Sequence, residues 1–259
     1  MNSALHVQTH GQGPDLVLVH GWGMHGGVFA PLAERLACRF RVHVVDLPGH
    51  GRTSADAAPF TLPALADTLR EALAPHLRGP AVWAGWSLGG MLALAVADRD
   101  PEAVEHLVMI AAAPRFSRAA DWPSGMEPDT LRDFAERLAA DPGETLQRFL
   151  ALQVMGTPAA RADLRRLREA MAGALPDAGA LAAGLAILLE GDLRPAWQEL
   201  ACPATLIGGE RDRLVRPEAL AAACALRPDV THHCLPEAGH APFIGHPGEV
   251  ARILEATAS

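Results

Sequence analysis

The sequence predicts an α/β fold in which a mostly parallel central sheet is flanked by helices and interrupted by an all-helical insertion. Short apolar, β-branched runs alternate with helix-like stretches up to residue 110. This alternation stops at Pro114 and resumes after residue 196. The chain has 259 residues, of which 49 % are hydrophobic, so it can bury the core of one large domain.

The expected strands are continuous apolar runs, which is the pattern of strands buried on both faces of a parallel sheet. They cover Leu16–Val19, Arg41–Val45, Ala81–Ala84, His106–Ile110, Ala204–Ile207 and Val230–Cys234. The helix-like stretches cover residues 31–37, 62–77, 88–99, 217–226 and 247–257. Strands and helices in alternation indicate βαβ units.

The segment 115–196 contains no convincing strand and is rich in Leu, Ala and Arg, with several prolines as breakers. We expect it to form a helical cap inserted into a core made of residues 1–114 and 197–259. Within it, Thr157 followed by Pro158 predicts the start of a helix, with Thr157 as the N-cap and the proline in the first turn.

The charge balance excludes several classes of function. The chain carries 22 arginines and no lysine against 30 acidic residues, a net charge of −8. An acidic chain is disfavoured as a nucleic-acid binder, which needs a basic footprint. Without lysine, neither a Schiff-base lysine nor a phosphate-loop lysine can exist. No cluster of histidines suggests a metal site, so we expect neither metal nor organic cofactor.

Cysteine usage and the apolar pattern bear on the compartment. Cys38, Cys202, Cys224 and Cys234 show no C-x-x-C spacing and no pairing pattern, which favours a reducing environment. The first residues lack a basic segment followed by an apolar one, and no apolar run reaches about 18 residues. We therefore expect a cytoplasmic protein without a signal peptide or membrane span, and a monomer.

A nucleophile motif stands between an expected strand and an expected helix. The run G-W-S-L-G-G at 85–90 has the G-x-S-x-G pattern of a nucleophile elbow. Its glycines remove side chains that would clash in the tight turn, so the serine hydroxyl stands clear of the sheet. We predict Ser87 as the nucleophile and the N–H of Leu88 as a donor to an oxyanion. The alternative is a glycine-rich turn with an ordinary serine.

A serine hydroxyl needs a base, and the base needs an orienting acid. In enzymes with this elbow the two follow later strands, in the chain order Ser, acid, His. His240 lies in a loop after the last expected strand and is predicted to be the general base and acid. Asp212 follows the preceding strand and is predicted to orient His240 through its Nδ1 proton. Glu210 is the competing acid.

The oxyanion hole needs a second N–H from the loop after an early strand. The run H-G-W-G at 20–23 occupies that loop, so we predict the N–H of Trp22 as the second donor, with its ring as a wall of the acyl pocket. His20 is expected to be a structural hydrogen-bonding residue rather than a base. The loop 46–54 is expected to support the site.

Five runs together resemble those of one enzyme family. They are H-G-W-G at 20–23, D-L-P-G-H-G-R at 46–52, G-W-S-L-G-G at 85–90, R-F-L-A-L-Q at 148–153 and G-H-A-P-F-I at 239–244. Over essentially its full length the chain resembles the α/β hydrolases, and among them the pimeloyl-(acyl-carrier protein) methyl ester esterases of biotin synthesis. The resemblance implies a serine carboxylesterase that removes the methyl ester of a pimeloyl chain on its carrier protein and releases methanol.

The resemblance also implies which residues contact the substrate. Trp22, Ser87, Leu88 and His240 would contact it at the reacting end, and a stretch of the cap would line its channel. That stretch consists of Phe149, Leu150, Ala151, Leu152 and Gln153.

Arginines gather in one part of the expected cap. Between residues 148 and 168 there are five Arg and one Asp, a local charge of +4. Carrier proteins are acidic, and a positive face would orient such a partner. The resemblance matches Arg148, Arg161 and Arg165 to arginines that bind the carrier protein, whereas Glu144 stands where the family has another arginine. The alternative is a solvated helix face.

Two other interpretations stay open. The first is another serine hydrolase of the same fold, such as a general short-chain carboxylesterase, a thioesterase or an aminopeptidase, because substrate choice depends on the cap. The second is a hydrolase fold used only as a binding module.

Overall fold

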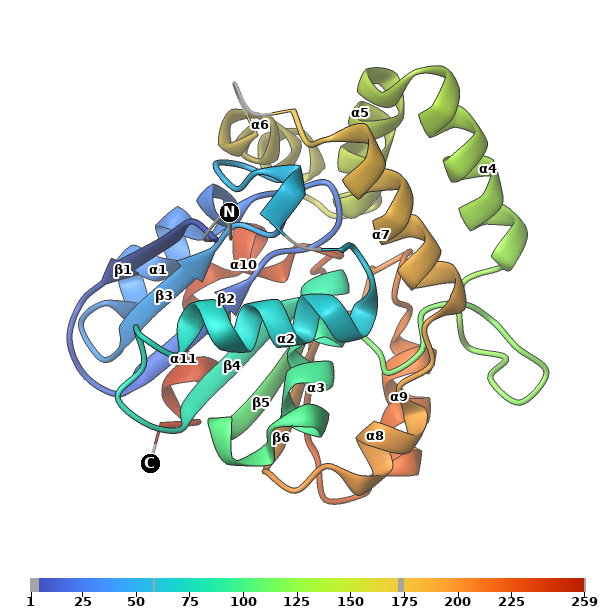
Figure 1. Ribbon diagram of the computed structural model, residues 1–259. Coiled ribbons are helices and arrows are strands. Elements are labelled where there is room, and N and C mark those ends of the chain that lie inside the picture. The colour runs from blue at the N-terminus through green and yellow to red at the C-terminus, as the bar shows by residue number, and fades with distance from the viewer. Residues whose placement is uncertain (1–4, 58, 172–174, 259) are drawn as a thin grey trace.

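The computed structural model describes residues 5–57, 59–171 and 175–258. Its centre is a seven-stranded sheet in the order β1-β3-β2-β4-β5-β6-β7 (Figure 1). β1 pairs with β3 in the antiparallel sense, and every other neighbouring pair is parallel. The strands are β1 (Val7–His10), β2 (Asp15–Val19), β3 (Arg41–Val45), β4 (Ala81–Trp86), β5 (Val104–Ile110), β6 (Ala204–Gly209) and β7 (Thr231–Leu235).

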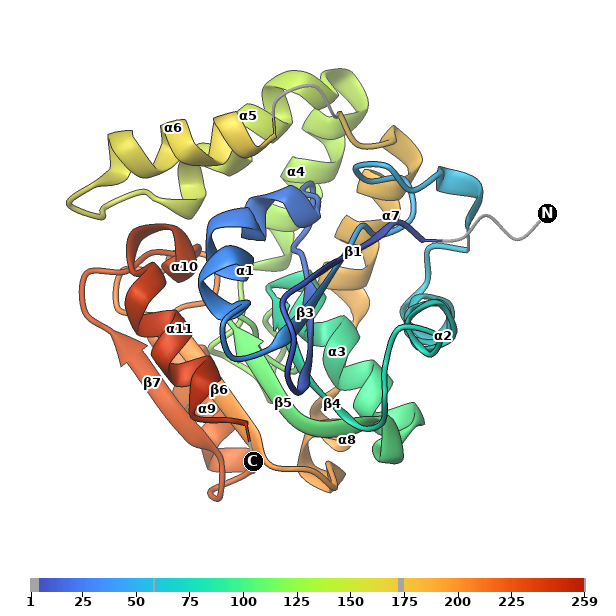
Figure 2. The same cartoon turned by 90° about the vertical axis from the view of Figure 1, so that its left-hand side faces the viewer.

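Helices cover both faces of the sheet, so β2 and β4 are buried along their whole length. Figures 1 and 2 show α2, α3, α8 and α9 on one face and α1 and α11 on the other. The helices before β5 and after residue 193 are α1 (Ala30–Leu36), α2 (Leu62–Leu73), α3 (Leu88–Arg99), α8 (Arg194–Glu199), α9 (Pro217–Leu226), α10 (Pro242–Gly245) and α11 (Pro247–Glu255). Short 3-10 turns are η1 (Gly26–Phe29), η2 (Ala55–Ala57) and η3 (Pro101–Ala103).

Four helices follow β5 and lie over the end of the sheet at which the parallel strands finish (Figure 1). They are α4 (Pro128–Ala140), α5 (Pro142–Gln153), α6 (Ala160–Ala170) and α7 (Ala178–Glu190). Within the described part of 115–196 the only β pairing is in isolated bridges. The boundary expected at residue 196 falls inside α8, whose Trp197 is fully buried in the core. No helix among the described residues is long and apolar enough to cross a membrane.

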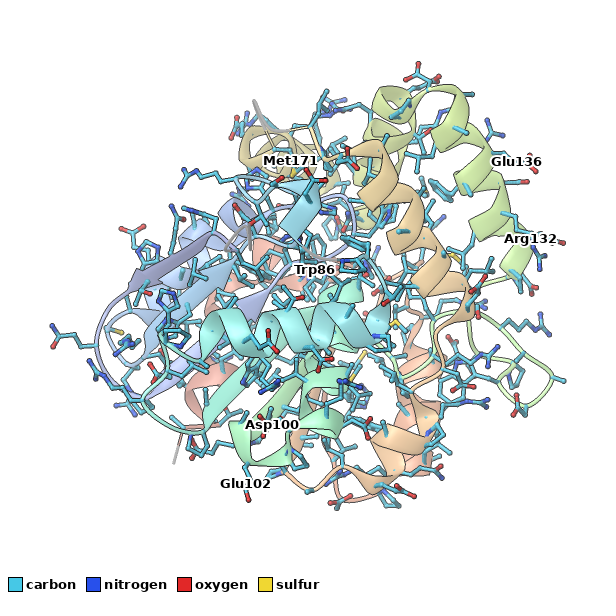
Figure 3. All side chains as sticks on the ribbon, in the orientation of Figure 1. Trp86, Asp100, Glu102, Arg132, Glu136 and Met171 are labelled. Atoms are coloured by element: carbon cyan, nitrogen blue, oxygen red, sulfur yellow. The ribbon has the colours of Figure 1, made fainter. Side chains whose placement is uncertain are left out.

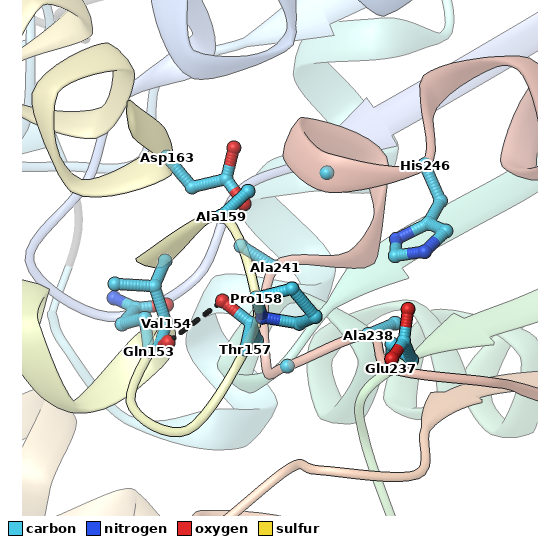
Figure 4. Close-up of a pocket in the computed structure, with 12 residues that line it drawn as sticks. Gln153, Val154, Thr157, Pro158, Ala159, Asp163, Glu237, Ala238, Ala241 and His246 are labelled. Atoms are coloured by element: carbon cyan, nitrogen blue, oxygen red, sulfur yellow. Dashed lines mark hydrogen bonds between the residues drawn. The ribbon is translucent and has the colours of Figure 1, made fainter. Parts of the chain in front are cut away.

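Several other elements also differ from the sequence-based expectation. Strand β1 was not predicted, because it is a partly exposed edge strand with polar residues and lacks the apolar run of a buried strand. The predicted helix 62–77 ends earlier, at Leu73. Thr157 is not an N-cap: α6 begins at Ala160, and the Thr157 hydroxyl donates to the carbonyl of Val154, 2.9 Å away (Figure 4). A Thr–Pro pair therefore closes the turn after α5 here.

Candidate active site

Ser87 sits in a strained turn between β4 and α3. Its φ of 55° and ψ of −119° lie in a region that L-residues rarely adopt. The turn depends on its glycines, because a Cβ on Gly85 would meet the carbonyl of Gly89, and one on Gly89 would meet the carbonyl of Val19. This turn places the Ser87 side chain at the carboxyl edge of the sheet, at the start of α3.

Asp212 and His240 form a fully buried pair from two loops, one after β6 and one after β7. The Nδ1 atom of His240 lies 2.9 Å from Oδ2 of Asp212. The other carboxylate oxygen accepts the N–H groups of Leu214 and Val215, at 2.8 and 3.0 Å. Because both oxygens are engaged, the carboxylate is fixed in position. The competing acid, Glu210, is exposed and accepts the N–H of Glu237 instead.

The remaining reactive atoms are buried and unpaired. Among the described residues neither the Oγ of Ser87 nor the Nε2 of His240 has a hydrogen-bond partner. Trp86, next to Ser87 in the chain, contacts the loop of His240. Its indole N–H donates to the main-chain carbonyl of His240 at 2.7 Å, and its ring centroid lies 5.9 Å from the imidazole centroid. The turn that carries Ser87 is thus tied to the loop that carries His240, and both side chains are buried. In structures without substrate, the hydrogen bond between a nucleophile and its base is often long and tightens only when substrate binds.

The loop after β2 runs directly beside Ser87. A Cβ on Gly21 would lie 3.3 Å from the Cβ of Ser87, so the main chain at this point is in contact with the elbow. In the described part of the chain, the amides of Trp22 and Leu88 donate to no protein acceptor. Main-chain N–H groups without an acceptor, beside a serine, can stabilise an oxyanion if they point at it.

His20 holds the loop rather than taking part in proton transfer at Ser87. Its Nδ1 lies 2.9 Å from the carbonyl of Gly21, and its Nε2 accepts the N–H of Leu47 at 3.0 Å. Burial, together with the nearby His50, lowers the pKa of His20 well below its usual range. A neutral ring can accept the Leu47 N–H, as this arrangement requires.

Helix α7 holds the side chain of Trp22. The indole N–H donates to the carbonyl of Leu181 at 2.8 Å. A Cβ on Gly184 would lie 2.6 Å from the Trp22 ring, so only glycine lets the helix approach this closely. Sequence analysis did not identify Gly184, since a lone glycine inside a helix gives no specific signal. The indole of Trp22 therefore faces α7, and its N–H is bonded to that helix.

The five substrate-channel residues expected on α5 divide between two environments. Phe149 meets the ring of Trp22 edge-on, with centroids 4.7 Å apart, in the same buried cluster as Leu88. Leu150 packs instead into the cluster on the other side, with Val154. Ala151 and Leu152 are half-buried. Gln153 is 1 % exposed and, among the described residues, its side-chain amide has no hydrogen-bond partner. Its main-chain carbonyl accepts the N–H of His240 at 2.8 Å.

A small cavity opens behind the His240 loop. It encloses about 190 Å³ between the turn after α5 and the residues on either side of His240 (Figure 4). Gln153, Thr157, Asp163 and Gly239 are among its lining residues, whereas Ser87 and His240 are not. Ser87 itself is 3 % exposed, so a substrate reaches it only when covering side chains move.

The three arginines expected to bind a partner are exposed on α5 and α6 but differ in their ion pairing. Arg148 pairs with Glu144 at 2.6 Å, and Arg165 lies 3.6 Å from Glu169. Arg161 forms no ion pair within the described residues. The described residues also contain no group of three or more His, Cys, Asp or Glu side chains placed to hold a metal ion.

A parallel sheet with a strained serine after a central strand, and a buried Asp–His pair from two later loops, is the arrangement of an α/β hydrolase. A family profile described as "Alpha/beta hydrolase family" matches residues 16–253. The chain belongs to this family.

Relatives of known name cover almost the whole chain. The chain is 49 % identical over 253 residues to a pimeloyl-(acyl-carrier protein) methyl ester esterase from Stenotrophomonas maltophilia strain K279a, covering 97 % of this chain and 95 % of that protein. It is 47 % identical over 251 residues to the protein of the same name from Xanthomonas campestris pv. campestris strain B100, covering 96 % and 97 %.

Solved structures agree on the fold. An esterase from Exiguobacterium antarcticum superposes with a TM-score of 0.86 at 20 % identity, over 97 % of this chain and 94 % of that one. An E-2-(acetamidomethylene)succinate hydrolase superposes with a TM-score of 0.77 at 26 % identity, over 98 % and 94 %.

Proposed function

We propose that this protein is a serine carboxylesterase that hydrolyses the methyl ester of pimeloyl-acyl-carrier protein, giving pimeloyl-acyl-carrier protein and methanol, in biotin biosynthesis. The observation that carries the chemistry is the buried Asp212–His240 pair, with Nε2 of His240 unpaired near the strained Ser87. The choice of substrate is supported by relatives of that name at 47–49 % identity over nearly the whole chain.

In the first half of the proposed reaction, Oγ of Ser87 attacks the ester carbonyl carbon while Nε2 of His240 takes its proton. The carbonyl oxygen becomes an oxyanion, which the N–H groups of Trp22 and Leu88 stabilise. The tetrahedral intermediate then expels methoxide, and His240 returns the proton to it. The products of this half are methanol and an acyl-enzyme on Ser87.

In the second half, His240 takes a proton from water as the water oxygen attacks the acyl carbonyl. The second tetrahedral intermediate collapses, the proton goes to Oγ of Ser87, and the free carboxylic acid leaves. Asp212 stays ionised throughout and stabilises the imidazolium. Neither half requires a metal or an organic cofactor.

For the cap we propose the segment containing α4 to α7, with the expected segment 115–196 shortened so that α8 belongs to the core. The proposed cap supplies Phe149 next to Trp22 and the carbonyl of Gln153 next to His240. We assign Phe149, Leu150, Ala151, Leu152 and Gln153 to the substrate channel. Phe149 and Gln153 have the strongest support, because both contact residues of the proposed catalytic machinery.

We assign carrier-protein docking to Arg148, Arg161 and Arg165. Positive side chains on α5 and α6 of an otherwise acidic protein favour an acidic partner, mainly through the association rate. Arg161 has the strongest support, because it is exposed and not engaged by an acid within the described residues. Arg148 is engaged by Glu144, which weakens its attraction for a partner.

The test is hydrolysis of pimeloyl-acyl-carrier protein methyl ester beside a free short-chain methyl ester, with wild type and Ser87→Ala. A much higher kcat/KM for the carrier-bound ester, lost in Ser87→Ala, supports the proposal. Equal rates on both esters would make the protein a general short-chain carboxylesterase, and a faster thioester reaction would make it a thioesterase. Failure of a fluorophosphonate to label Ser87 in folded protein would favour a binding module.

A further inference from the structure

The indole of Trp86 donates a hydrogen bond to the loop that carries His240. We propose that Trp86 is a positioning residue, whose N–H fixes the main chain of His240 and so keeps the imidazole aimed at Ser87; this inference rests on the proposed function. The hydrogen bond from Nε1 of Trp86 to the carbonyl of His240 is 2.7 Å long and buried. It joins the residue before the nucleophile directly to the residue that serves as base.

His240 is held at three points. Its N–H donates to the carbonyl of Gln153 at 2.8 Å, and its carbonyl accepts from Trp86. Its Nδ1 lies 2.9 Å from Asp212. The first two bonds fix the peptide planes on either side of the Cα, and the third fixes the rotation of the ring. The direction of Nε2 therefore depends on the main-chain bonds as much as on the carboxylate.

Trp86 itself cannot turn away. It is 1 % exposed and lies near the centre of the molecule in Figure 3. Phe243 meets its ring edge-on at 5.0 Å and Phe29 does so at 6.4 Å. On another side the Cα of Gly21 faces the ring, where an added Cβ would lie 3.2 Å from it. Because these neighbours already fix the ring, the hydrogen bond from its N–H to the His240 loop requires no further loss of side-chain entropy.

Trp83 provides a contrast on the same strand. It is fully buried like Trp86 but lies in the cluster on the opposite face of the sheet. Among the described residues its indole N–H has no hydrogen-bond partner. The same substitution at the two positions removes the same atoms from the same strand. Only at Trp86 does it remove a hydrogen bond to the catalytic loop.

The experiment compares Trp86→Phe with Trp83→Phe. For each variant, kcat and KM are measured on the methyl ester, per folded protein, and the downfield proton resonance of the His240 Nδ1–H is recorded at low pH. For Trp86→Phe we expect kcat to fall about three- to tenfold with KM nearly unchanged, since one hydrogen bond of ordinary strength is lost. We also expect the resonance to shift, because the ring moves relative to Asp212.

Trp83→Phe should lower the melting temperature but leave kcat, KM and the resonance as in wild type. If Trp86→Phe also changes only the melting temperature, Trp86 is a core residue and the proposal is wrong. Should Trp86→Phe fail to fold, benzothienylalanine at position 86 replaces the N–H by sulfur and keeps the bicyclic ring. The expected and contradicting results are then the same.

Different results would contradict the positioning role of Trp86 and the proposed function. A wild-type protein without activity on any methyl ester would contradict the function. The His240 resonance would still report whether the indole N–H positions the ring. Conversely, full activity in Trp86→Phe would leave the esterase assignment intact and contradict only the positioning role.

Discussion

The Nδ1 atom of His240 lies 2.9 Å from Oδ2 of Asp212, and neither side chain is exposed to solvent. The second oxygen of the carboxylate is occupied by two main-chain N–H groups. Among the described residues, Oδ2 accepts only from the imidazole. The pair therefore favours the tautomer in which Nε2 is unprotonated, as the role proposed for His240 requires.

Asp212→Asn should lower kcat by about 10⁴-fold with little change in melting temperature, because the amide favours the wrong tautomer of the imidazole. The measurement is steady-state hydrolysis of a methyl ester, with circular dichroism to check the fold. Glu210→Gln is the matched control, since Glu210 is exposed on the same loop. A larger loss in Glu210→Gln than in Asp212→Asn would reverse the assignment of the acid.

Gly184→Ala should reduce activity by about tenfold or more, because the new Cβ would lie 2.6 Å from the Trp22 ring and must push α7 or Trp22 aside. The displacement reaches the loop whose amide is assigned to the oxyanion hole. The measurement is kcat together with the melting temperature. Gly248→Ala is the control, because nothing lies within 4 Å of its added Cβ. Unchanged kcat in Gly184→Ala would show that the cap need not approach Trp22 this closely.

His50→Phe should make the protein less sensitive to acid. Burial lowers the pKa of His50 to about 4, whereas the unfolded chain titrates near 6.5. Between these values the unfolded state binds the extra proton, so stability falls as the pH drops from about 6.5 to about 4. A shift of this size corresponds to about 3 kcal/mol for a buried group.

Urea unfolding at pH 7.5 and pH 5 measures this effect. We expect the difference in unfolding free energy between the two pH values to be smaller in His50→Phe than in wild type. His10→Phe, at an exposed position, should leave that difference unchanged. An equal pH dependence in His50→Phe and wild type would contradict the role of His50.

Arg161→Glu should lower kcat/KM for a carrier-bound ester by about three- to tenfold and leave the free ester unaffected, because Arg161 has no competing acid within the described residues. The loss should shrink as salt is raised. Arg252→Glu on α11 changes the net charge equally and should have no such effect. A loss shared by both variants would mean that only overall charge matters.

Glu144→Gln provides a test in the opposite direction. It frees Arg148 from its 2.6 Å ion pair, so kcat/KM for the carrier-bound ester should rise. The free ester serves as the internal control, since both side chains are exposed whereas Ser87 is buried. A fall in kcat/KM for the carrier-bound ester would place the docking surface elsewhere.

The buried strands of the sheet, and the places of the predicted reactive residues after them, could be predicted from the amino-acid sequence alone. Ser87, Asp212 and His240 each follow a strand, and the carboxyl ends of parallel strands meet at one edge. The buried strands could be predicted because apolar runs are a local signal. β1 could not, since an edge strand held by β3 needs no such run. The start of α6 at Ala160, and not at Pro158 as predicted, could not be foreseen either, because the Thr157 hydroxyl bonds to the carbonyl of Val154 instead of capping the helix.

How these residues are held depends on long-range contacts that form when the chain folds. Asp212 is the better candidate for the acid than Glu210 because its loop buries it against His240, whereas the carboxylate two residues earlier is exposed. The roles proposed for Trp86, Gly184 and the main-chain carbonyl of Gln153 depend on contacts between segments more than 80 residues apart in the chain. A hydrogen bond across such a separation has no local pattern in the sequence, because it requires the sheet and the cap to be folded before its donor and acceptor meet.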